Sequence, residues 1–338
     1  MSAWQPLIGG GPSTPLPLST PPHHGGVTGA TLALCDHLTV IRATGAEAGV
    51  YLQGQLTCDL ADIDAGGHRT ALHLSLKGRG LVSLRLAKNG DSYLLVCPAR
   101  QVEETIACLL KYRLRAKVDF QVADDVLVAQ LAGDLAGTLA AAGLPLPEPG
   151  HLGTDTTGAG ASAAMTVWRY PRSEQALLIG DVAAFEASWP ALIAQRTVTD
   201  GDGARYQDVL AGEAQVYPGA QDLFLPQVLN YDVLGGVSFK KGCYTGQEVV
   251  ARMHFKGKLK QRMVAFAHEG APLTPGETVR NEEGRAVGEV VDGAPGEPRA
   301  VALIAVRLDH QGDLYRDDLP LHAEQLVLPY PLPKAKAS

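Results

Sequence analysis

The chain has 338 residues, 46% of them hydrophobic and 19% charged, and its formal net charge is −7. This length predicts two or three globular domains. The negative charge argues against broad, sequence-independent binding of nucleic acids, which needs a strongly cationic surface. It does not reveal how the charges are distributed, so a local basic groove stays open. No apolar run approaches the roughly 18–20 residues that cross a bilayer, and we expect no contact with membranes.

The two ends and the cysteines indicate the compartment. Residues 1–28 are rich in Pro, Gly, Ser and Thr and predict a disordered tail with neither the basic leader nor the apolar core of a signal peptide. Residues 331–338 predict a second loose end. The five cysteines are widely spaced without a Cys-x-x-Cys, and no His/Cys pair has zinc-site spacing. We therefore expect a reduced, cytoplasmic protein that builds no metal site of its own.

A first α+β unit is expected over residues 29–122. Its clearest signal is a hairpin, in which two runs of alternating polarity flank Asn89-Gly90, the preferred centre of a tight turn. A strand is predicted at 38–41 and a helix at 46–53. A second, amphipathic helix is predicted over 99–114, because apolar residues recur there at three- and four-residue spacing: Val102, Ile106, Leu109, Leu110 and Leu114. A strand at 118–122 closes the unit.

A second unit of similar order is expected over residues 123–205. A helix is predicted at 133–143, and another at 181–195 that is interrupted near Pro190. Residues 154–162 predict a loop. Strands are predicted at 126–131, 163–169 and 176–179. The repetition of similar elements in similar order suggests two related α+β units.

From residue 258 to residue 330 the pattern changes to short apolar strands separated by Pro/Gly turns. The strand candidates are 263–268, 286–292 and 300–306. Such spacing fits a small antiparallel barrel or sandwich.

The connecting segment 206–257 contains the sequence KKGCYTGQEVVAR, residues 240–252. Thr245 and Glu248 have the spacing of a capping box, which predicts a helix that begins just after Cys243. A helix N-terminus and two flanking lysines favour a thiolate, the form of cysteine that acts as a nucleophile or a metal ligand. Gly242 and Gly246 permit close approach of a ligand to the backbone. The alternative is a small buried cysteine beside a solvated Lys-Lys turn.

The string KGCYTGQE resembles the signature of the YgfZ family, bacterial folate-binding proteins related to the glycine-cleavage T-protein. Mitochondrial iron–sulfur assembly factors belong to the same group. Further segments resemble family landmarks in the same order, so that the resemblance covers about residues 36–310. These segments are 51–60, 76–80, 109–118 and 224–239.

The resemblance implies an α+β fold arranged as a three-domain, T-protein-like ring. Two ferredoxin-like α+β units, 29–122 and 123–205, would be joined through 206–257 to a C-terminal antiparallel β-barrel, 258–330. It also implies that tetrahydrofolate or a derivative binds in the central channel.

The resemblance assigns roles within the motif. Cys243 would be the reactive thiolate or metal ligand, and Lys241 would stabilise it or meet the folate glutamate tail. Tyr244 can stack on a flat heterocycle, and Gln247 can hydrogen-bond a pterin. Glu248 would do the same or act only as a cap. Residues carried over to cofactor binding also include Gly246 and Arg252, where Arg252 would clamp a carboxylate or pair with Glu248 on the helix surface.

Six residues outside the motif are further candidates for cofactor binding. Each has a plain structural alternative. Gln227 and Asn230 could serve turn and cap chemistry. Gln53 and Gln55 could lie at a helix-end surface, and Lys77 and Arg79 could lie in a solvated loop.

The function implied is a tetrahydrofolate-binding accessory factor for iron–sulfur cluster assembly or repair. Its partners would be iron–sulfur client enzymes such as the radical enzymes that methylthiolate tRNA, while direct binding of nucleic acid is not expected. The alternative is a folate-dependent aminomethyl or one-carbon transferase. That reaction needs an acid/base group near the reacting nitrogen, and we identify no counterpart of the T-protein's catalytic aspartate. Whether the chain is an enzyme stays open.

Overall fold

The computed structural model of the chain describes residues 4, 7, 26, 29–154 and 165–333. Most of the predicted N-terminal tail, most of the predicted loop 154–162 and the end of the C-terminal tail lie outside this part. In the described residues no helix has the length and apolarity needed to cross a membrane.

The first sheet is fully antiparallel and has the strand order β3-β4-β5-β2-β6. Its helices pack on one face over a core that includes Leu52, Leu95 and Leu109. The strands are β2 (Leu38–Thr44), β3 (His68–Leu74), β4 (Gly80–Asn89), β5 (Ser92–Pro98) and β6 (Asp119–Val122). The helices are α2 (Ala48–Gln55), α3 (Ala61–Asp64), the 3-10 turn η1 (Ala99–Gln101) and α4 (Val102–Leu110).

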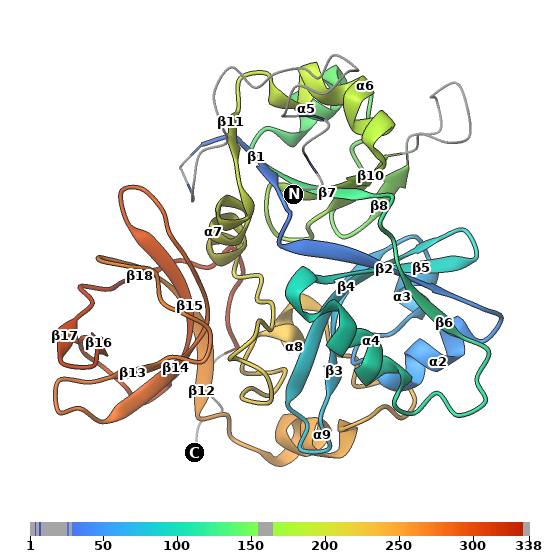
Figure 1. Cartoon of the computed structure of the whole chain (residues 1–338). Helices are drawn as coiled ribbons and strands as arrows, with labels where there is room; N and C mark the ends of the chain where they lie inside the picture. Colours follow the sequence, from blue (N-terminus) through green and yellow to red (C-terminus); the bar gives the residue numbers. More distant parts are fainter. Residues whose placement is uncertain (1–3, 5–6, 8–25, 27–28, 155–164, 334–338) are drawn as a thin grey trace.

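The second sheet has the order β11-β1-β7-β10-β9-β8, and α5 and α6 cover it at the top of Figure 1. Trp4 joins its core, with its ring centroid 4.9 Å from that of Phe185. The strands are β1 (Thr31–Leu34), β7 (Leu127–Ala132), β8 (Leu152–Thr154), β9 (Thr166–Arg169), β10 (Gln175–Gly180) and β11 (Thr197–Thr199). The helices are α5 (Leu135–Ala141) and α6 (Val182–Ile193). The earliest strand, β1, thus pairs with β7 and β11, far away in the sequence.

The third sheet is formed by the C-terminal part of the chain in the order β17-β16-β13-β14-β15-β12-β18. It is antiparallel, and its long strands enclose a core that includes Val279, Val290 and Ile304. The strands are β12 (Gln261–His268), β13 (Thr278–Arg280), β14 (Ala286–Ala294), β15 (Ala300–Arg307), β16 (Tyr315–Arg316), β17 (Leu319–Pro320) and β18 (Glu324–Leu326).

The segment between the second and third sheets runs through the middle of the molecule to its lower edge (Figure 1). It contains α7 (Gly201–Ala211), α8 (Tyr231–Leu234) and α9 (Gln247–Lys256). One apolar cluster joins residues of β3, of this segment and of the third sheet, for example Leu72, Tyr231 and Leu303. Ala204 of α7 belongs to a second cluster that joins the first and second sheets. The middle segment therefore packs against all three sheets, and this packing positions the motif.

The predicted α+β fold class with a C-terminal antiparallel unit is confirmed. Two details are wrong. The amphipathic helix ends at Leu110 and not at 114, because the chain turns and Leu114 is 94% exposed with a φ of 46°. Helix α6 runs through Pro190 without interruption, since burial of Phe185 and Trp189 outweighs the hydrogen bond that proline cannot make.

Candidate functional site

Helix α9 begins later than predicted and is capped differently. Its N-cap is Gly246, with a φ of 78°, and no side chain caps the helix. The predicted capping box of Thr245 and Glu248 is therefore wrong. The reason is tertiary contact: a Cβ on residue 246 would lie 2.6 Å from the carbonyl oxygen of Ser75. Only glycine fits the approach of the 75–79 turn at this point.

Cys243 lies in the segment just ahead of α9 and is exposed. The other four cysteines are buried or half-buried. Burial raises the pKa of Cys58 and of Cys97 to about 12, and it also raises the pKa of Cys108. Only Cys243 is placed to meet a large partner or substrate directly.

Lys241 faces inward and holds the motif against the first sheet's unit. Its Nζ donates to the carbonyl oxygens of Gln53, Leu56 and Cys58 at 2.6, 2.8 and 2.7 Å. It also lies 5.1 Å from the ring centroid of Tyr244. Burial lowers the pKa of Lys241 to about 8. With three carbonyl partners, this ammonium group has no donor left for the thiol or for a folate carboxylate.

The residues of the motif that follow divide between the interior and the surface. Tyr244 is buried, and burial raises its pKa to about 12. Gln247 is half-buried, whereas Glu248 and Arg252 are exposed. Among the described residues neither Glu248 nor Arg252 forms an ion pair, so the predicted alternative of a Glu248–Arg252 pair is absent from this structure.

The turn 75–79 packs on the start of α9. A Cβ on Gly78 would lie 2.8 Å from the Cβ of Val249. Lys77 and Arg79 are exposed, and Arg79 donates to the backbone oxygen of Asp222 at 3.1 Å. The carboxylate of Asp222 accepts from the Ser75 hydroxyl at 2.6 Å. The Asp222 carboxylate thus reaches this turn from a distant part of the chain, and no local pattern around residue 77 reveals it.

Gln227 and Asn230 lie inside the molecule and bond to its framework. The Gln227 amide donates to the Val250 carbonyl at 2.8 Å, while its oxygen has no partner. Asn230 donates to the Met263 carbonyl at 3.0 Å and accepts from Arg262 at 3.0 Å. These bonds tie the middle segment to α9 and to the third sheet.

Gln53 and Gln55 lie near the end of α2. Gln53 donates to Asp59 and accepts from the backbone of Leu60, both at 2.9 Å, and it lines an open pocket of about 930 Å³ between α2, α3 and the β4–β5 hairpin. Gln55 is buried and its side-chain oxygen has no partner. Its backbone oxygen contacts the His73 ring at 3.2 Å.

Sequence reasoning missed a buried polar layer between the first and second sheets. Arg85 on β4 pairs with Asp208 on α7 at 2.9 Å, and both side chains are almost fully buried. Asp208 also accepts from Gln130 at 2.7 Å and from the Tyr170 hydroxyl at 3.1 Å. The signal was present in the sequence: Arg85 interrupts the strand run LVSLRLA, and a strand that is buried on both faces must pair such a charge internally.

Several polar atoms around this layer have no hydrogen-bond partner. They are Nη1 of Arg85, both side-chain amide atoms of Gln215 and the hydroxyl of Tyr217. Glu213 is buried beside them, and burial raises its pKa to about 7 against the opposing effect of Arg85. Buried polar atoms are nearly always satisfied by protein or ordered water, so these groups are the ones in this layer that a small polar ligand or a water molecule would meet.

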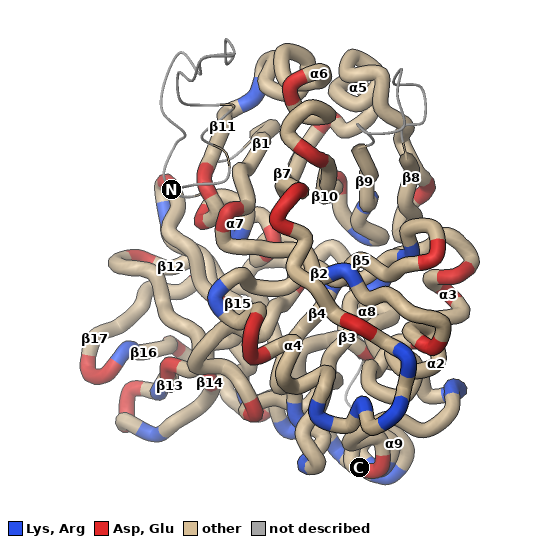
Figure 2. Tube along the Cα trace, turned by 45° about the vertical axis from the view of Figure 1, so that its right-hand side comes forward, with Lys and Arg blue, Asp and Glu red and all other residues tan. Residues whose placement is uncertain are grey.

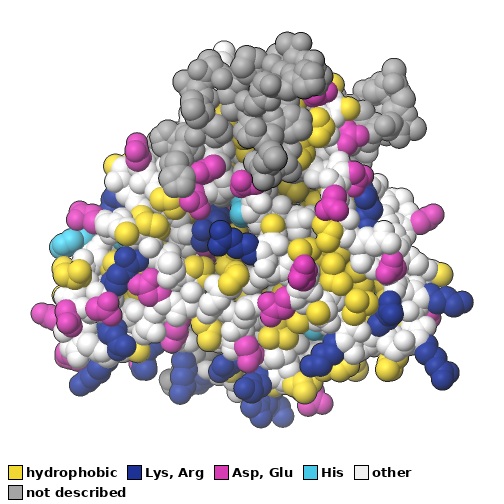
Figure 3. Space-filling view, viewed as in Figure 1, with side chains coloured by type: hydrophobic (Ala, Val, Ile, Leu, Met, Phe, Trp, Pro, Cys, Tyr) yellow, Lys and Arg dark blue, Asp and Glu magenta, His cyan; other side chains and the backbone are white. Residues whose placement is uncertain are grey.

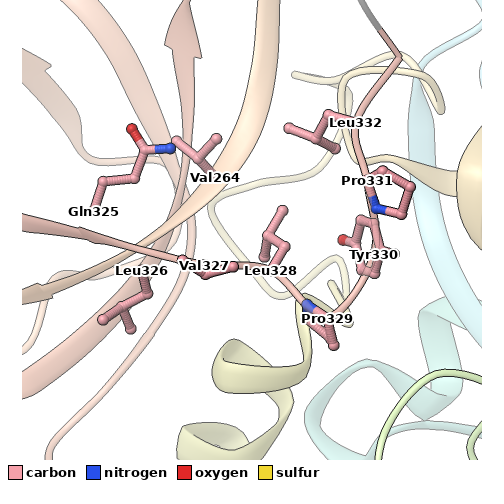
Figure 4. A pocket seen from close by; sticks show the side chains of 9 residues that line it. All are labelled: Val264, Gln325, Leu326, Val327, Leu328, Pro329, Tyr330, Pro331 and Leu332. Atoms are coloured by element: carbon pink, nitrogen blue, oxygen red, sulfur yellow. The ribbon is translucent and has the colours of Figure 1, made fainter.

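A separate hollow of about 560 Å³ lies beside β18 and the chain that follows it (Figure 4). Its lining is mainly apolar, from Leu326, Leu328, Pro329 and Tyr330 among others. None of the predicted site residues lines it.

Comparison with known proteins places the chain in context. No family model matches it. A tRNA-modifying protein YgfZ from Vibrio vulnificus is 29% identical over 258 residues, which are 76% of each chain. Proteins of the same name from Shigella boydii and Escherichia coli O157:H7 are 28% identical over 315 residues, 87% of this chain and 94% of theirs. This chain is a homologue of the YgfZ proteins.

The structural comparison agrees with the sequence comparison. Glycine cleavage system aminomethyltransferase T from Bartonella henselae superposes with a TM-score of 0.68 over 89% of this chain and 86% of its own, at 19% identity. At this identity the likeness shows the fold alone. The resemblance to YgfZ and the T-protein-like fold predicted from the motif are both confirmed.

Proposed function

We propose that this protein binds tetrahydrofolate or a derivative and supports the assembly or repair of iron–sulfur clusters on which tRNA methylthiolation depends. The observation that carries this proposal is the exposed Cys243 on a segment anchored by Lys241. Its YgfZ relatives are named tRNA-modifying proteins. One exposed thiol cannot hold a four-iron cluster by itself, so the remaining ligands would come from a partner.

The buried polar layer carries hydrogen-bonding groups of the kinds that a pterin would need. A pterin ring carries both donors and acceptors, and the layer offers the amide of Gln215, the guanidinium of Arg85 and the carboxyl group of Glu213. These residues would hold the ring, and Tyr217 would add a hydroxyl. Tetrahydrofolate, when bound, supplies a reduced ring that can hold a one-carbon unit. The part of this chain is to orient that ring and to keep it away from water.

A folate-dependent one-carbon transferase is the second candidate. One observation favours it: a carboxyl group with a pKa near the working pH is suited to general acid–base chemistry, and burial gives Glu213 a pKa of about 7. On this hypothesis Glu213→Gln abolishes aminomethyl turnover and Cys243→Ala leaves it intact. The accessory-factor hypothesis predicts no turnover with an aminomethyl donor.

Calorimetric titration of the full chain with tetrahydrofolate tests the binding site. We expect Gln215→Leu to weaken binding about tenfold, as loss of one or two hydrogen bonds predicts. Gln325→Leu is the matched control, because Gln325 is exposed beside the apolar hollow, and it should bind like the wild type. Absence of binding by the wild type, or equal effects of the two variants, would contradict the proposed site.

A further inference from the structure

Three basic segments lie at one end of the molecule, around α9. They are the turn 76–79, residues 111–117 after α4, and residues 252–260 at the end of α9 and beyond. We call them together the basic end surface. None of the three contains an Asp or Glu. Lysines and arginines gather along the lower edge of Figures 2 and 3, around α9 and below α4.

Contacts place the three segments close together. Gly78 in the first segment packs against Val249 of α9. The charge of Lys111 in the second segment is near enough to His73, on the strand that leads into the turn, to add to the lowering of its pKa by burial. The first segment therefore lies beside the helix that leads into the third, and the second lies near the strand that leads into the first. Figure 2 shows lysines and arginines of distant parts of the chain gathered around α9.

The cations of this surface are not neutralised within the described residues. Elsewhere, Arg42, Arg262 and Arg299 form ion pairs with carboxylates. No lysine or arginine of the basic end surface forms an ion pair with a carboxylate in the part of the chain that the structure describes. Its exposed cations are Lys77, Arg79, Lys111, Arg113, Arg115, Lys117, Arg252, Lys256, Lys258 and Lys260. In a protein of net charge −7 this is a concentrated positive field.

Large apolar side chains stand among these cations. Leu76 is 78% exposed, Leu114 94%, Phe255 64% and Tyr112 41%. The Phe255 ring is oriented by two others: its centroid lies 4.8 Å from His254, edge to face, and His254 stacks on Phe239 at 3.7 Å. An exposed ring held in place within a basic surface is the arrangement on which unpaired bases stack.

We propose that the basic end surface binds RNA with unpaired bases. Lysines and arginines would contact the phosphates, and Phe255 and Tyr112 would offer stacking faces. A protein partner fits less well, because lysine is depleted in protein–protein interfaces and six of the cations are lysines: Lys77, Lys111, Lys117, Lys256, Lys258 and Lys260. Net charge had argued against nucleic acid, but it averages over a surface that is strongly uneven.

Fluorescence anisotropy with the full chain and a labelled RNA hairpin that has an unpaired loop tests this inference. We expect the protein to bind this RNA. The logarithm of the association constant should fall linearly with the logarithm of the salt concentration between about 50 and 200 mM. The triple variant Lys256→Glu, Lys258→Glu, Lys260→Glu should bind much more weakly and reduce the salt slope by about two or more. Arg285→Glu, at an exposed site in the turn between β13 and β14, should change neither the affinity nor the salt slope.

A second variant tests the stacking. Phe255→Ala should weaken binding of the looped hairpin about tenfold and leave binding of a fully paired duplex unchanged. Leu319→Ala is the control, because Leu319 is 71% exposed but lies on β17. Absence of RNA binding at about 100 µM protein, or tighter binding of a polyglutamate peptide than of the hairpin, would overturn the proposal. Tetrahydrofolate binding should survive all these changes, so the two proposals fail separately.

Discussion

Lys240 and Lys241 are neighbours in the chain with opposite environments. Lys240 is exposed, whereas Lys241 is buried and bonds to three carbonyls. The sequence KK predicted two similar charges beside Cys243. In the structure one lysine anchors the motif and the other contributes charge at the surface. Which of two adjacent lysines turns inward depends on where the end of α2 lies, and local sequence does not encode that.

Substitution of each lysine tests whether Lys241 anchors the motif and Lys240 does not. Lys241→Met should lower the free energy of unfolding by about 2–4 kcal/mol, because three carbonyl acceptors lose a charged donor. Lys240→Met should change it by less than about 0.5 kcal/mol. Urea denaturation of both variants measures the difference. Equal stabilities would contradict an anchoring role for Lys241.

Helix α9 shows which features of a helix can be predicted from the sequence. The spacing of Thr245 and Glu248 predicted a helix here, and the helix forms, although without that capping box. Its first residue could not be predicted, because Gly246 caps it under the constraint of the distant Ser75 carbonyl. The end of α4 could not be predicted either. Leu114 has the spacing of the helix's apolar face, but the chain leaves the helix at Leu110, and Leu114 is exposed. Periodicity predicts that an element exists, and long-range contact decides where it ends.

The two glycines of the motif test this account of the helix start. Gly246→Ala should destabilise the protein by about 1–3 kcal/mol, because residue 246 has a φ of 78° and its Cβ would clash with Ser75. Gly242→Ala should be nearly neutral, since no atom lies within 4 Å of the added Cβ. Thermal unfolding compares them, and a neutral Gly246→Ala would show that the turn and α9 are not in tight contact.

In the molecule as a whole, the first and second sheets meet across a layer that is partly polar. The T-protein-like fold was predictable from the motif and its order of landmarks, and the structural likeness bears it out. The polar layer could not be predicted from the sequence, because Arg85, Asp208 and Gln130 come from three elements far apart in the chain. Polar residues that meet only after folding leave no local spacing to recognise.

Glu213 should make the stability of the protein depend on pH. Its carboxyl pKa is raised from 4.5 to about 7 by burial, so the folded chain binds the proton more tightly than the unfolded chain. Its contribution to stability is therefore complete below about pH 4.5 and is lost as the pH rises through 7. Glu213→Gln should resemble the wild type at about pH 4 and be more stable by about 1–3 kcal/mol at about pH 8. Urea denaturation at both values measures this, and a pH-independent difference would contradict it.

Complementation tests most directly whether the Cys243 thiol is required for the protein's role in tRNA methylthiolation. An Escherichia coli strain that lacks its YgfZ would carry the wild-type chain, Cys243→Ala or Cys108→Ala, and methylthiolated tRNA nucleosides would be measured by mass spectrometry. Cys108 is the control because it is half-buried and lies on α4, outside the motif. We predict restoration by the wild type and by Cys108→Ala, and none by Cys243→Ala produced at the same level. Full restoration by Cys243→Ala would contradict the account.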